Sequence, residues 1–354
     1  MMNARILCVV LLAAAVAVAP ALAGNDNTGT SCANFLKIGV GARAAAMGGA
    51  YVASVTDYSA LYWNPAGIAR IPGVQVGIAY TDWVLDISHS FIGATYSLGQ
   101  WGTIGASLNL LDFGEMERVT PSEPNGTGTY FGASDLALGV AYARELTDRF
   151  AVGVQFKVVR ESISFSSASA IAVDAGTQFV TGFRNMRLGM SISNFGGKMT
   201  MRGTDQMVKA DIDDVIGGNP LKESRLETEA WPLPLTFRMG LSLDVLRSNL
   251  ATVTVNTDFV DPRDVNPYAA AGTEISWNNM VFLRGGLVYS PDGFDEEKMS
   301  KEQELNLFYK VKIAAGGGVR FSVPGTHAAF ALDYAYTDLG MLDYAHRFSL
   351  VITY

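Results

Sequence analysis

The chain has 354 residues, of which 49% are hydrophobic and 17% are charged, and it contains 37 glycines. An average soluble domain carries roughly 25% charged residues and about 7% glycine, so this composition differs from that of an ordinary soluble enzyme. The formal net charge of -8 provides no basic surface for neutralising phosphates. Nucleic acid is therefore excluded as an expected partner.

The N-terminus has the pattern of a secretory signal peptide. Arg5 gives a positive start, residues 6–19 are an apolar run, and Ala21-Leu22-Ala23 is a small-x-small cleavage site. Residues 1–23 are therefore predicted to be a signal peptide. The apolar run is shorter than the roughly 20 residues that span a bilayer, and no later stretch is longer, so no transmembrane helix is expected.

The chain from residue 74 onward alternates between apolar and polar residues. In residues 233–244, large apolar side chains occupy one face, whereas Arg238, Ser242 and Asp244 lie on the other. Such long strands with a small or charged second face favour an outer-membrane barrel over a soluble β-sandwich. The predicted strands are 74–82, 86–98, 101–114, 130–143, 149–161, 170–180, 186–195, 233–244, 249–260, 266–277, 280–290, 309–321, 327–338 and 343–354.

The connections between these stretches alternate in length. The short ones are 99–100, 144–148, 181–185, 245–248, 278–279 and 322–326, and the longer ones are 115–129, 162–169, 196–232, 291–308 and 261–265. Bacterial barrels have short periplasmic turns and longer outer loops, so both ends of the strand series are expected in the periplasm. The long connection 196–232 is the first candidate for contact with a partner.

The predicted fold class is therefore all-β. Residues 74–354 are expected to form a single transmembrane antiparallel β-barrel of about 14 strands. It would lie in the outer membrane of a Gram-negative-type bacterium, surrounded by outer-membrane lipid, with its N- and C-termini in the periplasm.

The last strand carries a second signal. Its apolar face consists of Phe348, Leu350, Ile352 and Tyr354, and the sequence stops on that aromatic residue. A terminal aromatic on an apolar face resembles the signal that delivers barrel proteins to the outer-membrane assembly machinery. We therefore expect the barrel assembly machinery to be a partner.

Residues 24–73 do not have the strand pattern. Residues 39–50 are rich in Ala and Gly, and residues 57–67 suggest short helical turns that end at Asn64-Pro65, where the chain would be redirected into the first strand. Asp57 would either cap a turn or pair with Arg43 inside the barrel. The spacing of Gly39, Gly41 and Ala44 fits a dinucleotide fingerprint, but no α/β sheet surrounds it.

A family resemblance is carried by this segment. Residues 41–43, 47–53 and 57–69 contain Met47-Gly48-Gly49-Ala50-Tyr51-Val52-Ala53 and Leu61-Tyr62-Trp63-Asn64-Pro65-Ala66-Gly67. This pattern resembles the opening motif of the PorV/PorQ family, which is similar to the FadL-type barrels. The resemblance implies that residues 24–73 fold into the lumen as a plug or hatch. The motif residues are Gly41, Arg43, Gly48, Gly49, Asp57, Asn64, Pro65 and Ala66.

No catalytic constellation is visible. His89, His327 and His346 lie on separate predicted strands, and the sequence shows no nucleophile and base with a third orienting group. The acidic loop at Asp292, Asp295, Glu296 and Glu297 does not have the spacing of an EF-hand. We expect no enzyme activity, no metal and no cofactor.

The sequence leaves three functions open. The resemblance implies a non-enzymatic component of protein export or surface attachment, with secretion-system proteins and exported cargo as partners, because PorV-like members act with the type IX machinery. The alternative is a FadL-type transporter of hydrophobic compounds, in which Met47, Tyr51, Tyr62 and Trp63 would line the site for a hydrophobic small molecule. A general porin is disfavoured by the predicted plug.

Overall fold

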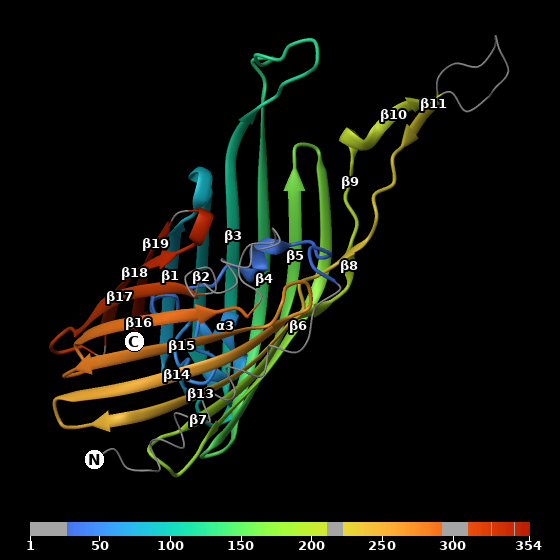
Figure 1. Ribbon diagram of the computed structural model, residues 1–354. Helices are drawn as coiled ribbons and strands as arrows, with labels where there is room; N and C mark the ends of the chain where they lie inside the picture. Colours follow the sequence, from blue (N-terminus) through green and yellow to red (C-terminus); the bar gives the residue numbers. More distant parts are fainter. Residues whose placement is uncertain (1–26, 211–221, 292–310, 327, 343) are drawn as a thin grey trace, which may run out of the picture.

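The barrel is closed by the pairing of its first strand with its last, which are distant in the chain. The computed structural model describes residues 27–210, 222–291, 311–326, 328–342 and 344–354. Among these residues, 14 long antiparallel strands form the ring, because β1 (Val74–Asp82) pairs with β19 (Tyr344–Thr353) and β5 (Phe150–Ile163) pairs with β6 (Ser166–Val180) (Figure 1). The predicted signal peptide lies outside the described residues.

The remaining strands of the ring match the predicted series. They are β2 (Ser88–Ser97), β3 (Thr103–Glu117), β4 (Tyr130–Thr147), β7 (Arg187–Gly196), β13 (Thr236–Arg247), β14 (Ala251–Pro262), β15 (Tyr268–Trp277), β16 (Val281–Tyr289), β17 (Val311–Ser322) and β18 (Ala329–Asp338). The predicted all-β barrel is thus confirmed.

One predicted connection is wrong. Residues 162–169 do not form a longer loop, because β5 and β6 continue toward each other and leave only residues 164–165 between them. Ser164 has a left-handed backbone, with φ of 51°, which suits a tight hairpin turn. The hairpin therefore extends the barrel wall instead of ending it.

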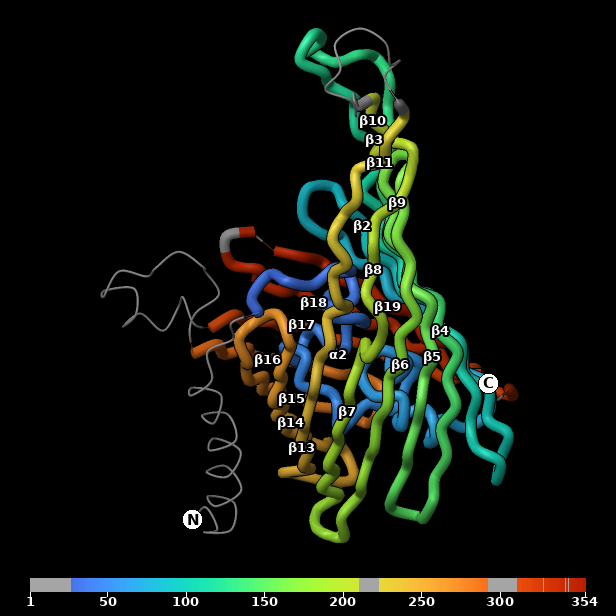
Figure 2. The backbone as a smooth tube through the Cα atoms, turned by 90° about the vertical axis from the view of Figure 1, so that its right-hand side faces the viewer, coloured from blue at the N-terminus to red at the C-terminus, as the bar shows by residue number. Residues whose placement is uncertain are grey.

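The two ends of the barrel differ. The loop end carries the connections 83–87, 118–129, 197–235 and 263–267, and the turn end carries 98–102, 148–149, 181–186 and 248–250. Strands β3 and β4 and the hairpin of β10 and β11 rise well beyond the rest of the wall at the loop end (Figures 1 and 2).

The long connection at the loop end has structure of its own. Strand β8 (Lys198–Met199) pairs with β12 (Trp231–Pro232), and β10 (Met207–Ala210) pairs with β11 (Lys222–Arg225). Strand β9 (Arg202–Gly203) adds to the loop end of β6. The connection is therefore a set of small strand pairs that lengthen the wall. Short 3-10 helices are η4 (Val84–Asp86), η5 (Gly99–Trp101), η6 (Thr204–Gln206) and η8 (Gly340–Leu342).

The segment before β1 runs lengthwise through the lumen. Its helical turns are η2 (Asn34–Lys37), α2 (Ala42–Ala46), α3 (Ala60–Trp63) and η3 (Pro65–Arg70). At the loop end the Cys32 N–H donates to the Pro232 carbonyl at 3.0 Å, and near the turn end Arg70 lies 3.0 Å from the Glu145 carboxylate. None of the helices in the described ranges is long and apolar enough to cross a membrane.

Glycines on the inner face of the barrel make room for this segment. A Cβ on Gly189 would lie 2.5 Å from the carbonyl oxygen of Val52, and one on Gly272 would lie 2.5 Å from the Cβ of Met47. The glycines that face the segment in this way are Gly77, Gly93, Gly105, Gly153, Gly176, Gly189, Gly240, Gly272, Gly286 and Gly316. Each lies on a different strand, so the segment is seated against nearly the whole ring.

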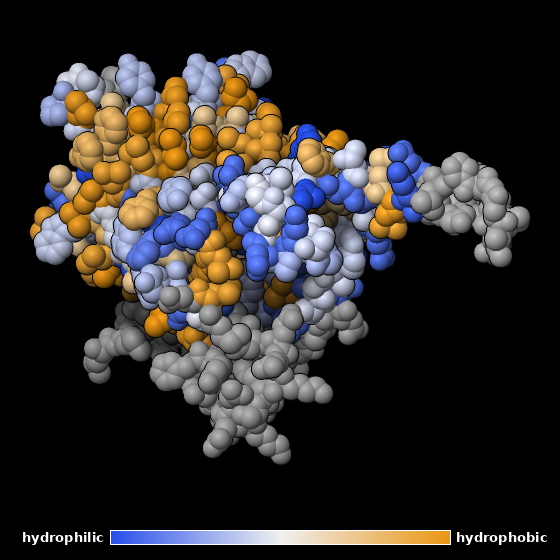
Figure 3. Space-filling model, turned by 90° about the horizontal axis from the view of Figure 1, so that it is seen from above, coloured by the Kyte–Doolittle hydropathy of each residue, from blue (hydrophilic) through white to orange (hydrophobic). Residues whose placement is uncertain are grey.

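The outer face of the wall is apolar. Along β1, Val76, Ile78 and Tyr80 are exposed, whereas the side chains between them, such as Ala79 and Thr81, are buried. Figure 3 shows hydrophobic side chains gathered on the visible part of the side wall and polar ones toward the loop end. This is the arrangement that a barrel needs in a bilayer.

Two neighbouring glycines on β16 provide a direct test of the seating. Gly286 faces the segment, whereas a Cβ on Gly285 would meet nothing within 4 Å. We expect Gly286→Val to lower the free energy of unfolding by about 1–3 kcal/mol through overpacking. Gly285→Val is the matched control and should leave stability unchanged. Denaturant unfolding of the purified barrel measures both, and equal effects would contradict the seating.

Cys32 tests the anchorage of the segment at the loop end. Its thiol donates to the carbonyls of Trp231 and Pro232 at 3.3 Å each. Burial, together with the charge of Glu161, raises the pKa of the Cys32 thiol to about 11. Because an ordinary thiol has a pKa of about 8.5, iodoacetamide at pH 8 should alkylate the folded protein on the order of a hundredfold more slowly than the unfolded protein. Mass spectrometry measures the two rates, and similar rates would contradict the burial.

Candidate functional site

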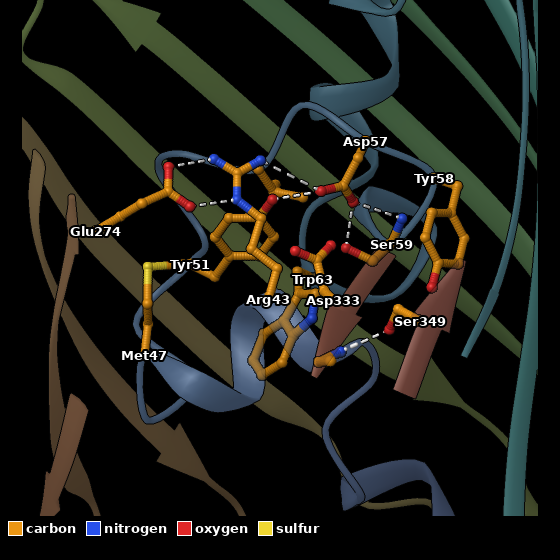
Figure 4. Close-up of polar contacts among 12 residues, drawn as sticks. Arg43, Met47, Tyr51, Asp57, Tyr58, Ser59, Trp63, Glu274, Asp333 and Ser349 are labelled. Atoms are coloured by element: carbon orange, nitrogen blue, oxygen red, sulfur yellow. Dashed lines mark hydrogen bonds and ion pairs between the residues drawn. The ribbon is translucent and has the colours of Figure 1, made fainter. Parts of the chain in front are cut away.

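The site is the junction between the N-terminal segment and the barrel wall, and its centre is a chain of alternating charges. Arg43 on α2 donates from Nε and Nη2 to the carboxylate of Glu274 on β15, at 2.8 Å each. Glu274 also accepts from Nε of Arg284 at 2.7 Å, and Arg284 donates to Asp333 at 2.5 Å. The network ties α2 to β15, β16 and β18. Figure 4 shows the contacts of Arg43 with Glu274 and Asp57.

Asp57 completes this network from within the segment. Its carboxylate lies 3.6 Å from Nη1 of Arg43, accepts the Tyr51 hydroxyl at 2.5 Å, and accepts the Ser59 N–H at 2.9 Å. Asp57 therefore both pairs with Arg43 and caps a turn, the two roles that its position suggested. Burial lowers the pKa of the Arg43 guanidinium, but Glu274 and Asp57 together raise it well above its ordinary value, so Arg43 stays charged.

Wall side chains also hold the backbone of the segment. Asp258 on β14 accepts the N–H groups of Tyr51 and Val52 at 2.8 and 2.9 Å, and Ser349 on β19 accepts the N–H of Ala42 at 2.7 Å. Further bonds of this kind run from Tyr58 N–H to Gln75, from Gln178 to the Val55 carbonyl, and from Ser191 to the Trp63 carbonyl. These bonds replace those that water would make to a buried backbone.

Asn64 and Pro65 determine how the segment turns between α3 and η3. Asn64 ends α3 with an extended backbone, its Oδ1 accepts the Ala66 N–H at 3.2 Å, and its Nδ2 donates to the Val52 and Thr177 carbonyls at 3.0 Å each. The expectation that the chain turns here directly into the first strand is wrong. The helical turn η3 comes first, because Asn suits the N-cap and Pro suits the first helical position.

The glycines of the motif lie at the ends of α2. Gly41 precedes the helix with φ of 84°, and Gly48 and Gly49 follow it with φ of 66° and 81°. These are left-handed values that favour glycine. A Cβ on Gly48 would also lie 2.9 Å from the carbonyl oxygen of Leu287 on β16, so this turn packs directly on the wall.

The segment divides the lumen into two cavities of different character. The loop-end cavity measures about 580 Å³ and has Tyr62 and Trp63 in its lining. The turn-end cavity measures about 500 Å³, is mostly polar, and has Arg43 and Met47 in its lining. Tyr51 is fully buried and belongs to neither cavity. The four residues expected to line one hydrophobic site are thus not brought together.

The C-terminal residues lie on the outside of the barrel. Phe348, Ile352 and Tyr354 are exposed, and Leu350 lies on the same face of β19. Because β19 pairs with β1 along residues 75–82, this face borders the seam at which the barrel closes.

The two histidines in the described residues do not lie together. Buried His89 contacts Asn109 at 2.6 Å, and His346 contacts the Tyr334 hydroxyl at 2.8 Å on the outer face. His327 and the acidic loop at 292–297 lie outside the described residues. In the described parts of the chain, no three His, Cys, Asp or Glu side chains gather where a metal could bind.

Several residues of the site were not found from the sequence. Asp258, Glu274, Gln178 and Ser349 are polar residues at inner-face positions of strands. The alternation that identified the strands marks such inner-face positions. It does not show which residue of the N-terminal segment each side chain contacts, and these partners are distant in the chain, as for Gln178 and Val55. The inner-face glycines on ten strands would have been the clearest signal that the lumen is filled.

The family model for the type IX secretion system protein PorV matches residues 22–261. The chain belongs to the PorV family. It is therefore an outer-membrane β-barrel of the type IX secretion system. The barrels of this family are not enzymes.

Solved structures show the same fold at low identity. This PorV-family chain is similar to the toluene transporter TodX of Pseudomonas putida (TM-score 0.52, 13% identity) and to the toluene transporter TbuX of Ralstonia pickettii (TM-score 0.53, 13% identity), covering 89% of this chain and 97% of each transporter. A FadL homologue of Pseudomonas aeruginosa gives a TM-score of 0.51 with 11% identity, covering 88% of this chain and 97% of that one. A search of curated proteins finds no match.

The charge network predicts that Arg43 holds the segment in place. Arg43→Gln would leave Asp57 without its guanidinium and Glu274 with only Arg284. Since breaking a buried pair leaves an uncompensated charge, we expect a loss of about 3 kcal/mol in the free energy of unfolding. Exposed Arg144, which has no ion pair in the described residues, gives the control Arg144→Gln. Denaturant unfolding compares them, and equal stability of the two variants would contradict the network.

Proposed function

We propose that this PorV-family barrel serves protein export by binding exported proteins and secretion-system components at the outer membrane, and that residues 24–73 are a plug within a barrel of residues 74–354. The observation that carries the proposal is the occluded lumen. The segment is buried over most of its length, and it packs against an inner-face glycine on each of ten strands. A barrel filled in this way is suited to binding at its ends and not to open diffusion.

The motif residues support the role of the segment as a plug. Arg43 and Asp57 belong to the charge network, and Asn64 bonds to the carbonyl of Thr177 on β6. Gly41, Gly48, Gly49, Pro65 and Ala66 shape the turns between these anchors.

We also propose an orientation. Short turns of bacterial barrels face the periplasm, which would place the turn end, the start of β1 and the C-terminal end of β19 there. The first described residues lie elsewhere, since Gly29 donates to the Asp264 carbonyl at the loop end at 3.2 Å. The loop end would then face the cell exterior, and its long hairpins would contact secretion-system proteins and cargo.

The outward row of Phe348, Leu350, Ile352 and Tyr354 supports recognition by the barrel assembly machinery. The row lies on the apolar outer face of the last strand, next to the closing seam. Such a row is accessible before β19 pairs with β1 and faces lipid afterwards.

Two observations favour a second function. The loop-end cavity has aromatic side chains in its lining, and the fold is similar to that of proteins described as toluene transporters. Transport of hydrophobic compounds would require displacement of the plug, and Tyr62 and Trp63 would then be the lining residues to alter.

The export function predicts which surface is needed. Replacing residues 119–128, at the tip of the β3–β4 hairpin, with a short Gly-Ser linker should remove secretion-system proteins from the material that copurifies with the tagged barrel. The same linker in place of residues 99–101 at the turn end is the control. Mass spectrometry of barrels purified from the native outer membrane measures the difference. Recovery of a lone wild-type barrel holding a hydrophobic molecule would favour transport.

A further inference from the structure

The turn-end cavity is lined by three arginines that have no carboxylate partner. Arg187 lies at the start of β7, Arg247 at the end of β13 and Arg320 near the end of β17. In the described part of the chain, none of the three has an ion pair within 4.0 Å. Arg320 lies over the ring of Phe282, at 5.5 Å from its centroid. The cavity therefore carries positive charge at the turn end of the barrel.

The acidic side chains in the lining do not neutralise these arginines. Glu274 is paired with two other arginines, at 2.8 and 2.7 Å. Asp244 accepts from Nδ2 of Asn185 at 3.1 Å and from the Thr254 hydroxyl at 2.9 Å, and it forms no ion pair within the described residues. Like charges around a concave surface concentrate ions of the opposite sign. The cavity therefore attracts anions.

The rest of the lining is polar without being charged. Hydroxyl and amide side chains dominate it, and they come from the segment, from three neighbouring strands and from a turn: Ser54, Ser242, Asn249, Thr252, Asn256 and Ser276. Such side chains both donate and accept hydrogen bonds. The cavity measures about 500 Å³, which is the size of a small-molecule site.

Two buried atoms in this lining have no partner among the described residues. The Ser54 hydroxyl of the segment and Oδ1 of Asn256 on β14 belong to side chains that are 6% and 2% exposed, and neither atom forms a hydrogen bond. A buried polar atom without a partner costs free energy. Because Oδ1 of an amide can only accept, a ligand that satisfies it supplies a donor as well as negative charge for the arginines.

We propose that the turn-end cavity binds a phosphorylated sugar, with the phosphate held among Arg187, Arg247 and Arg320 and the sugar hydroxyls paired with Ser54 and Asn256. This site lies at the opposite end of the barrel from the surface proposed for export and does not depend on that function. In the orientation proposed above, the ligand would enter from the periplasm.

The lining favours a sugar phosphate over two other kinds of anion. Inorganic phosphate supplies mainly acceptors, so it would leave Asn256 unpaired and most of the cavity unfilled. An acidic peptide presents its hydrogen-bonding groups mainly along its backbone and at its carboxylates. A sugar presents hydroxyls in most directions, which matches a lining in which Met47 and Phe282 are the apolar residues among those described.

The experiment compares two probes that differ only in the phosphate, trehalose 6-phosphate and trehalose. Calorimetric titration of the full barrel in phosphatidylcholine nanodiscs gives a dissociation constant for each. Inorganic phosphate and an acetylated tetra-aspartate amide are titrated as the bare anion and the acidic peptide. We expect trehalose 6-phosphate to bind about tenfold more tightly than each of the other three probes, because only it offers both charge-assisted hydrogen bonds and hydroxyl donors.

Variants assign the phosphate preference to the three arginines. In the triple variant Arg187→Gln, Arg247→Gln and Arg320→Gln, the ratio of the dissociation constants of trehalose and trehalose 6-phosphate should fall to about one. Arg149→Gln is the matched control, because Arg149 is exposed in the connection 148–149 at the same end and does not line the cavity. If the triple variant does not fold, each single variant should lower the ratio about twofold or more.

A serine variant tests where the sugar lies. Ser54→Ala removes a hydroxyl that has no other partner, so we expect it to weaken binding of both trehalose probes about threefold and to leave inorganic phosphate unaffected. Ser290→Ala is the control, because Ser290 is equally buried but lines the loop-end cavity.

Four outcomes would overturn the inference. Equal binding of trehalose and trehalose 6-phosphate by the wild type would remove the phosphate, and a preference that survives in the triple variant would remove the arginines. Binding of inorganic phosphate or the acidic peptide as tightly as the sugar phosphate would replace the ligand class. Unchanged affinity of Ser54→Ala for both sugars would contradict the placement of the sugar.

Discussion

The structure depends on the fit of a polypeptide segment inside a closed ring of strands. A barrel of 14 strands is too wide for its own inward side chains to fill its lumen. Here a chain segment, with its own backbone polar groups, occupies that space. Two kinds of wall residue accommodate the segment. Glycines such as Gly189 lie where its backbone comes close, and buried side chains such as Asp258 form hydrogen bonds with its backbone. The strand sequences are therefore constrained from both faces, by lipid outside and by the segment inside.

The charged residues that contact the segment differ between its turn-end side and its loop-end side. On the turn-end side, Arg43 is balanced by Glu274 and Asp57, so charge fixes the segment to the wall. On the loop-end side, Arg238 and Arg347 are buried against aromatic rings without such partners in the described residues. The buried arginines of the wall are thus held differently at the two ends, because Arg284 is paired with carboxylates and Arg238 and Arg347 lie over aromatic rings.

Much of the barrel could be predicted because strand periodicity is local. Alternation over ten or so residues identifies a strand without any knowledge of its partner, which is why all the strands of the ring were found. The same rule failed at 162–169, where Ser164 allows a two-residue turn and the ladder simply continues. The partners of the segment could not be predicted, because the contact of Arg43 with Glu274 joins residues 231 apart in the chain. The grouping of Met47, Tyr51, Tyr62 and Trp63 could not be settled from the sequence for the same reason, since Met47 lines the turn-end cavity and Tyr62 lines the loop-end cavity.

The similarity to hydrocarbon transporters and the membership of a secretion family are compatible once fold and site are separated. A barrel with a filled lumen is a scaffold, and its function is decided by the residues that its ends present. A purely apolar ligand needs an apolar cavity, and two buried guanidinium groups in its wall would oppose such a ligand by their cost of desolvation. Arg238 and Arg347 therefore set this cavity apart from a purely apolar one, and the long hairpins rise at the same end of the barrel.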